Sequence, residues 1–98
     1  QQHPRFPVMM YMDKDELIDS MEDHECLLAD GFDNAIIGIS SGFNPIAVYD
    51  YGKCVEILME RDQMSSEDAI EFMDFNVTGA YVGEKTPMFV HLPYSCDE

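Results

Sequence analysis

The chain has 98 residues, of which 20 are Asp or Glu and 5 are Lys or Arg, so its formal net charge is −15. This length allows one domain. The hydrophobic fraction of 46% is close to the globular norm, so the acidity does not by itself indicate disorder. The charge argues against nucleic acid and against an anionic membrane surface as partners, because so few cations cannot offset the repulsion. No apolar run approaches the roughly 18 residues of a membrane span.

We expect a single α+β domain over residues 13–92, between an N-terminal segment of extended character (1–12) and a frayed tail (93–98). Charge is uneven along the chain, because two acidic stretches flank residues 34–49, which carry no charge. The uncharged stretch has the strongest strand signals, and the acidic stretches show helical periodicity. This pattern predicts a neutral sheet backed by solvated helices.

The first helix is predicted at about residues 14–29. Asp13 with Glu16 has the form of a capping box at its start. Apolar residues then recur at helical spacing; they are Leu17, Ile18, Met21 and Leu28. Gly31 supplies the end of the helix, because glycine adopts the left-handed conformation easily.

A β-hairpin is the economical interpretation of residues 35–49. Two short runs rich in β-branched and aromatic residues, 35–39 and 46–49, are separated by turn residues that include Gly42 and Pro45. Because both runs are almost continuously apolar, we expect much of both faces of the hairpin to be covered.

Two further helices are predicted at about 51–62 and 66–76, with Asp50 and Ser65 as their N-caps. Their short connection resembles that of a DNA-binding helix-turn-helix. The second of these helices carries acids and no Lys or Arg, which would oppose contact with the phosphates of a major groove. An ordinary αα-hairpin is therefore predicted.

Gly79 ends the helical region, and residues 80–82 and 88–90 add one or two strands. The fold class predicted from the sequence is α+β. About three helices pack on a small antiparallel sheet, which consists of the hairpin at 35–49 and the C-terminal strand or strands.

Motifs that carry chemistry are absent from the sequence. It contains no Gly-x-Ser-x-Gly, P-loop, Gly-x-Gly-x-x-Gly or His-Glu-x-x-His motif. The acids of residues 13–25 are most simply a solvated helix face, and the stretch that starts at Asp30 does not match a calcium loop. His24 beside Cys26 is too small a set for zinc. We therefore predict no catalytic residue, no metal ligand and no cofactor.

Polar residues inside an apolar segment give one candidate functional loop. Asn76 and Thr78 lie between large hydrophobic residues, and Gly79 follows them. In a structural interpretation, Asn caps the end of the helix and Gly permits close packing. The sharper hypothesis is a functional loop built on Asn76, Tyr81 and Glu84.

The cysteines indicate the compartment. They are odd in number and form no Cys-x-x-Cys pair, whereas a secreted chain of this length usually has an even disulfide framework. The N-terminal segment has no apolar core of signal-peptide length. We therefore expect an intracellular, cytoplasmic protein, in which Cys54 is a small buried hydrophobe among apolar neighbours.

Two segments resemble those of a family of small acidic hypothetical proteins from phages and marine-type bacteria. The first is residues 49–59, and the second runs from Glu67 through residues 75–84 to Pro87. The resemblance covers about residues 30–90. It implies a phage-linked origin and an infected host cell as the setting, and it transfers no activity and no site residue.

The predicted function is non-enzymatic action through protein contacts. An uncharged hairpin and eight methionines predict an apolar face that a partner protein or a second copy covers. One alternative is an inhibitor whose aligned carboxylates imitate the phosphates of a nucleic acid and so occupy a nucleic-acid-binding protein. A second alternative is a small metal-dependent enzyme.

Overall fold

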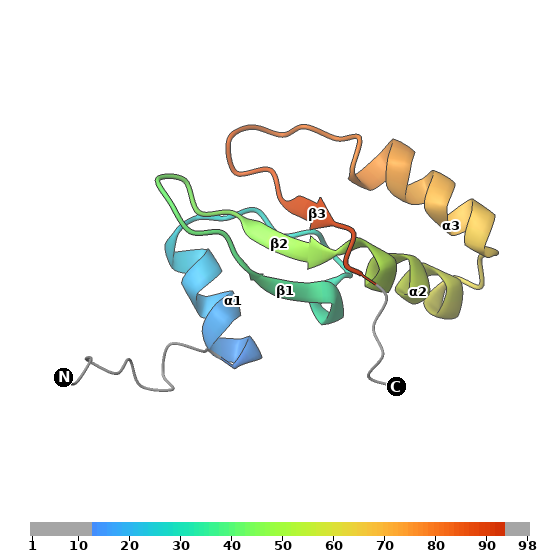
Figure 1. Cartoon of the computed structure of the whole chain (residues 1–98), viewed down its shortest axis with the longest axis horizontal. Coiled ribbons are helices and arrows are strands. Elements are labelled where there is room, and N and C mark those ends of the chain that lie inside the picture. The colour runs from blue at the N-terminus through green and yellow to red at the C-terminus, as the bar shows by residue number, and fades with distance from the viewer. Residues whose placement is uncertain (1–12, 94–98) are drawn as a thin grey trace.

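The computed structural model describes residues 13–93, so the predictions for residues 1–12 and for the end of the tail lie outside the described residues. The predicted α+β class, with three helices and a small sheet, is confirmed (Figure 1). The elements in chain order are α1 (Lys14–Asp23), the 3-10 turn η2 (Asp33–Ala35), β1 (Ile36–Ile39), β2 (Ala47–Asp50), α2 (Tyr51–Arg61), α3 (Ser66–Phe72), the π-helical turn η3 (Met73–Val77) and β3 (Met88–Val90).

The sheet has the order β1-β2-β3 and is mixed. β1 and β2 form the predicted antiparallel hairpin, with an irregularity between Ile36 and Gly38. β3 pairs with β2 in parallel, with Phe89 opposite Tyr49, which differs from the expected antiparallel arrangement. A parallel pair needs a long crossover connection. Helices α2 and α3 and the loop after them supply it, so β3 enters the sheet in the same direction as β2.

Helix α1 starts at the predicted capping box but ends at Asp23, well before the predicted residue 29. Glu25 adopts a left-handed φ of 60°, and the Cys26 N–H donates a hydrogen bond to the Met21 carbonyl at 2.8 Å. These are features of a Schellman closure. Met21 and Cys26 are both buried, so the burial of an apolar pair ends this helix in place of a glycine.

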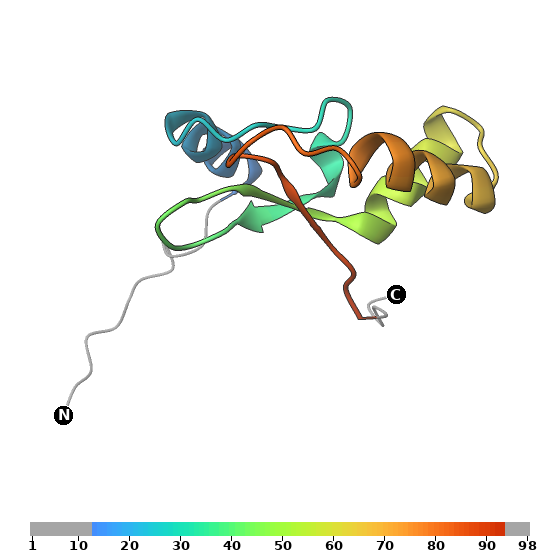
Figure 2. The same ribbon diagram turned by 90° about the horizontal axis from the view of Figure 1, so that it is seen from above.

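Helices α2 and α3 lie side by side and form the predicted αα-hairpin (Figures 1 and 2). Their predicted N-caps are present, because the side chains of Asp50 and Ser65 accept hydrogen bonds from the first turn of each helix. The third helix was predicted to run to residue 76. Its α-helical part ends at Phe72, and η3 continues it with wider turns.

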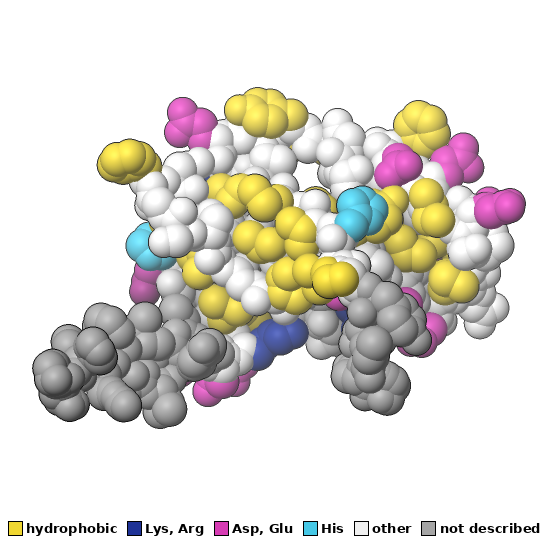
Figure 3. Space-filling view, viewed as in Figure 1, with side chains coloured by type: hydrophobic (Ala, Val, Ile, Leu, Met, Phe, Trp, Pro, Cys, Tyr) yellow, Lys and Arg dark blue, Asp and Glu magenta, His cyan; other side chains and the backbone are white. Residues whose placement is uncertain are grey.

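The two faces of the sheet differ in their cover. Tyr49 and Ala47 point to one face and are 0% exposed, beneath α1 and residues 24–35 (Figure 2). Met88 points to the other face and is 44% exposed, and a Cβ added to Gly38 would meet nothing within 4 Å. Figure 3 shows hydrophobic side chains gathered over the strands on this open face. The expectation that both faces of the hairpin are largely covered is therefore wrong for one face.

Candidate functional site

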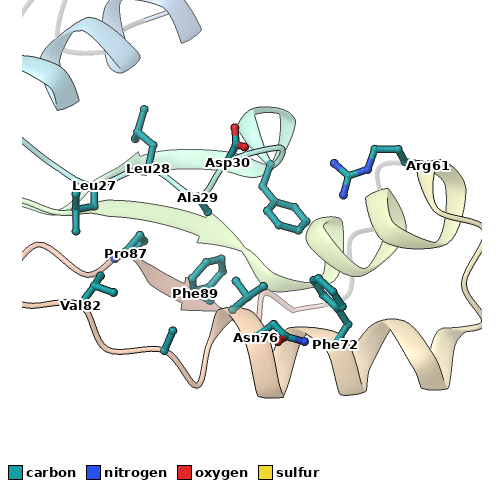
Figure 4. Close-up of a pocket in the computed structure, with 13 residues that line it drawn as sticks. Leu27, Leu28, Ala29, Asp30, Arg61, Phe72, Asn76, Val82, Pro87 and Phe89 are labelled. Atoms are coloured by element: carbon teal, nitrogen blue, oxygen red, sulfur yellow. The ribbon is translucent and has the colours of Figure 1, made fainter.

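A groove of about 580 Å³ lies where the cover of the sheet ends beside β3. Figure 4 shows residues 27–30 along one side, Phe72 and Asn76 along the other, and Phe89 between them. The apolar lining consists of Leu27, Leu28, Ala29, Phe32, Phe72, Val77, Ala80, Val82, Pro87 and Phe89. The polar lining consists of Asp30, Arg61 and Asn76. A concave, mostly apolar surface with a few convergent polar groups is the usual form of a binding site.

Buried Tyr49 holds the floor and one wall of the groove together. Its ring stacks on Phe89 with ring centroids 5.1 Å apart and planes at 22°. Its hydroxyl accepts a hydrogen bond from the Ala29 N–H at 2.7 Å, which fixes the wall formed by residues 27–32. Burial raises the pKa of Tyr49, so the phenol stays neutral in this position.

Arg61 forms the lining at one end. Its guanidinium carbon lies 5.6 Å from the centroid of the Phe32 ring, and Nη1 donates to the Gly31 carbonyl at 3.0 Å. Nε and Nη2 donate to the Asp62 carboxylate at 3.2 and 3.1 Å. This hydrogen-bonded pairing raises the pKa of Arg61 and lowers the pKa of Asp62. The guanidinium therefore lies at the wall in an exposed ion pair with Asp62.

Asn76 lies in η3, on the opposite side of the groove (Figure 4). The turn closes through a hydrogen bond of 2.7 Å from the Thr78 N–H to the Met73 carbonyl. Gly79 follows this turn. A larger residue is disfavoured there, because its Cβ would collide with the carbonyl oxygen of Asp74. Within the described part of the chain, the Asn76 amide makes no hydrogen bond, so it is available to a ligand. Such π-turns occur frequently at functional sites.

The structure brings one of the three predicted loop residues into the groove. Asn76 lines it, whereas Tyr81 and Glu84 do not, and Tyr81 is 77% exposed. The Glu84 carbonyl accepts a hydrogen bond from Asn44 Nδ2 at 2.7 Å, which ties the loop to the turn of the hairpin. Glu84 thus contributes its backbone to loop position, and its carboxylate is exposed.

Sequence analysis missed the wall formed by residues 27–32, because residues 27–29 were assigned to the first helix and Asp30-Gly31 to its end. It also missed Arg61 and Phe72, which are assigned to helices but contribute to a groove between elements. The sequence predicted a helix end at Gly31. Gly31 does have a left-handed φ of 91°, but α1 ends earlier, at Asp23, so Gly31 bends a loop and not the end of a helix.

Two further kinds of chemical group are the possible metal ligands and the cysteines. Across residues 13–93, no group of three His, Cys, Asp or Glu residues is placed to hold a metal ion. Cys26 and Cys54 are buried free thiols. Burial raises the pKa of Cys54 to about 12, and the prediction of a buried hydrophobe is confirmed there. None of the helices in the described range combines the length and apolar character of a membrane crossing.

The chain matches no protein-family model, no curated protein and no solved structure. The resemblance to small acidic phage and bacterial proteins therefore stays a prediction. The geometry of the groove alone carries the functional assignment.

Proposed function

We propose that this protein acts by binding an apolar segment of another protein in the groove beside β3. The observation that carries the proposal is a concave apolar lining that stays open next to a closed core. At its rim, Leu27 is 42% exposed and Val82 is 60% exposed. Covering such side chains is favourable, at roughly 25 cal/mol per Å² of apolar surface removed from water.

The polar groups of the groove suit a peptide backbone. A carboxamide both donates and accepts hydrogen bonds, and a peptide unit offers one donor and one acceptor. Asn76 can therefore pair with the main chain of a bound segment, while the apolar lining takes its side chains. Recognition of this kind fixes the direction of the segment without requiring a particular side chain at that point.

The lining favours binding over a reaction. It contains no Ser, Thr, Cys, His or Lys, so it does not present a nucleophile beside a base. The hypotheses of a nucleic-acid mimic and of a metal-dependent enzyme stay predictions, because no feature of the groove favours them. A cytoplasmic setting in a phage-infected host is likewise a prediction.

A designed peptide tests the proposal directly. The probe is a short, dye-labelled amphipathic peptide built from Leu and Gln, and its binding is followed by fluorescence anisotropy. We expect saturable binding at one site, which the double variant Leu27→Ser, Val82→Ser weakens about tenfold or more, because the burial of each such side chain stabilises by roughly 1.5–3 kcal/mol.

A matched control comes from the open face of the sheet. Ile37 and Met88 are 45% and 44% exposed, so the variant Ile37→Ser, Met88→Ser removes similar apolar side chains that do not line the groove. We expect this control to bind the peptide as the unmodified chain does. An equal loss in both variants, or no saturable binding to the unmodified chain, would contradict the proposal.

A further inference from the structure

A second hollow adjoins the groove at its Arg61 end. It shares Asp30 and Arg61 with the groove. Two further carboxylates line it, those of Asp33 and Glu60. The local cations offset them only in part. Arg61 is paired with Asp62, and Lys14, whose Nζ donates to the Asp33 carbonyl at 2.9 Å, is one positive charge beside the three carboxylates of the lining. This end of the groove is therefore an acidic rim.

A third hollow adjoins the groove on its other side, across from residues 27–30 (Figure 4). It shares Phe72 and Asn76 with the groove, and its further lining includes the carboxylates of Asp68 and Glu71. No Lys or Arg lines this hollow. Phe75 also lines it and is 74% exposed, which places an aromatic ring next to two acids. A ring beside carboxylates is a favourable surface for the stem and the charge of a Lys or Arg side chain.

We infer that the segment bound in the groove is cationic as well as apolar, with hydrophobic side chains that enter the groove and Lys or Arg side chains that reach the acids beside it. The inference rests on the proposed function and assigns the chemistry of its partner. Carboxylates on both sides of the groove match these cationic side chains, and the net charge of −15 attracts them from a distance. Complementary charge of this kind raises the rate of encounter and rejects acidic competitors.

Other occupants fit the charges less well. An anionic ligand would find Arg61 as the cation of the groove lining, and the carboxylates of Asp30 and Asp62 beside that guanidinium would repel it. A nucleic acid would meet carboxylates on both sides of the groove, as would a second copy of this acidic chain. Binding of a basic amphipathic segment would remove apolar surface from water and would also reduce the repulsion between the carboxylates.

Three matched peptides separate this inference from the proposed function. They share one pattern of Leu residues and carry Lys, Gln or Glu at the remaining positions. By fluorescence anisotropy, we expect the Lys peptide to bind about tenfold more tightly than the Gln peptide at low salt, and the Glu peptide to bind most weakly. The advantage of the Lys peptide should shrink at about 0.5 M salt, because screening then acts over a few ångströms.

A charge-neutralising variant locates the effect. Asp68→Asn with Glu71→Gln should weaken binding of the Lys peptide about 3- to 10-fold and leave the Gln peptide unchanged, as expected for exposed charge pairs. The control, Asp19→Asn with Glu22→Gln, changes the net charge equally on α1, outside the lining of the hollows. Because Asp68 lies in the first turn of α3, Glu71→Gln alone serves as a second variant that leaves the cap intact.

The outcomes are distinguishable. Equal binding of the Lys and Gln peptides overturns the inference and leaves the proposed function standing. An equal loss in the α1 control also overturns it, because the effect would then come from net charge and not from the rim. If no peptide binds, the proposed function fails together with the inference.

Discussion

The two faces of the sheet have similar apolar composition and opposite surroundings. Alternate residues of β2 point to opposite faces, so buried Tyr49 and partly exposed Val48 are neighbours in sequence. The covered face lies under α1 and residues 24–35, and it opens into the groove only beside Phe89. The open face presents partly exposed strand side chains (Figure 3). Apolar sequence alone therefore locates neither the core nor the binding site.

Shape and polar groups separate the two uncovered apolar surfaces. The groove is concave, and Asp30, Arg61 and Asn76 line it alongside its apolar residues. The open face offers hydrophobic side chains such as Ile37 and Met88 at the surface of the strands. A binding site needs both an apolar lining and groups that fix orientation. The groove meets this requirement, and the open face suits less specific association.

The largest expected effect on stability comes from a substitution on the covered face of the sheet. Tyr49→Ala should lower the free energy of unfolding by about 3–5 kcal/mol, because it removes a fully buried aromatic ring. It should also abolish peptide binding, since the ring supports Phe89 and the Ala29 wall. Urea denaturation measures the first effect. Tyr81→Ala, at a position 77% exposed, is the control and should change stability by less than about 0.5 kcal/mol. Similar losses in the two variants would refute the assignment of the core.

Substitutions at two glycines compare the crowded backbone beside η3 with the open face of the sheet. Gly79→Ala should destabilise the protein by about 1–3 kcal/mol, because the new Cβ would collide with the Asp74 carbonyl oxygen. Gly38→Ala, at a position where a Cβ meets nothing within 4 Å, should change stability by less than about 0.5 kcal/mol. Chemical denaturation of both variants decides the point, and an equal cost would contradict the described geometry.

The pH dependence of stability tests whether the Cys54 thiol is buried. The pKa of Cys54 rises from an ordinary value of 9.0 to about 12, mainly because the thiol is buried. Above pH 9 the unfolded chain releases this proton and the folded chain keeps it, so the free energy of unfolding should fall as pH rises. The expected loss is about 1 kcal/mol between pH 9 and 10. Cys54→Ala should show a shallower decline, and an identical slope would argue against a buried thiol.

A smaller effect on stability than that of Tyr49→Ala is expected on the open face. Ile37→Ser with Met88→Ser should lower the free energy of unfolding by about 1–3 kcal/mol in total, since nearly half of each side chain is already exposed. If copies of this chain associate at high protein concentration in high salt, the same variant should weaken that association. Sedimentation of both proteins at several concentrations checks this, and a large loss of stability would mean that the face is covered.

Local features of the fold were predictable from the sequence, and tertiary features were not. The N-caps at Asp50 and Ser65 depend on residues within one turn, and the sequence showed them. At the end of α1, Met21 and Cys26 are both buried and joined by a backbone hydrogen bond, and no glycine in the sequence marks this position. The direction of β3 follows from how α2 and α3 pack, so the antiparallel expectation could not be corrected beforehand.

Of the three functional residues predicted from the sequence, only one lies in the candidate site. Asn76 was noticeable because a polar residue interrupts an apolar segment, and it does line the groove. Tyr81 and Glu84 belong to the same segment, but proximity in sequence does not make side chains converge. The groove joins Leu27, Phe72 and Phe89 from three distant parts of the chain, and only the folded structure brings these residues together.

The most direct test of the central claim is a map of backbone and side-chain amide NMR shifts during titration with the Leu–Lys peptide. The proposed groove predicts the largest shifts at residues 27–32, at residues 72–82 and at the side-chain amide of Asn76. Shifts centred on Ile37 and Val48 of the open face, or shifts spread evenly over the acidic surface, would contradict a binding site in the groove.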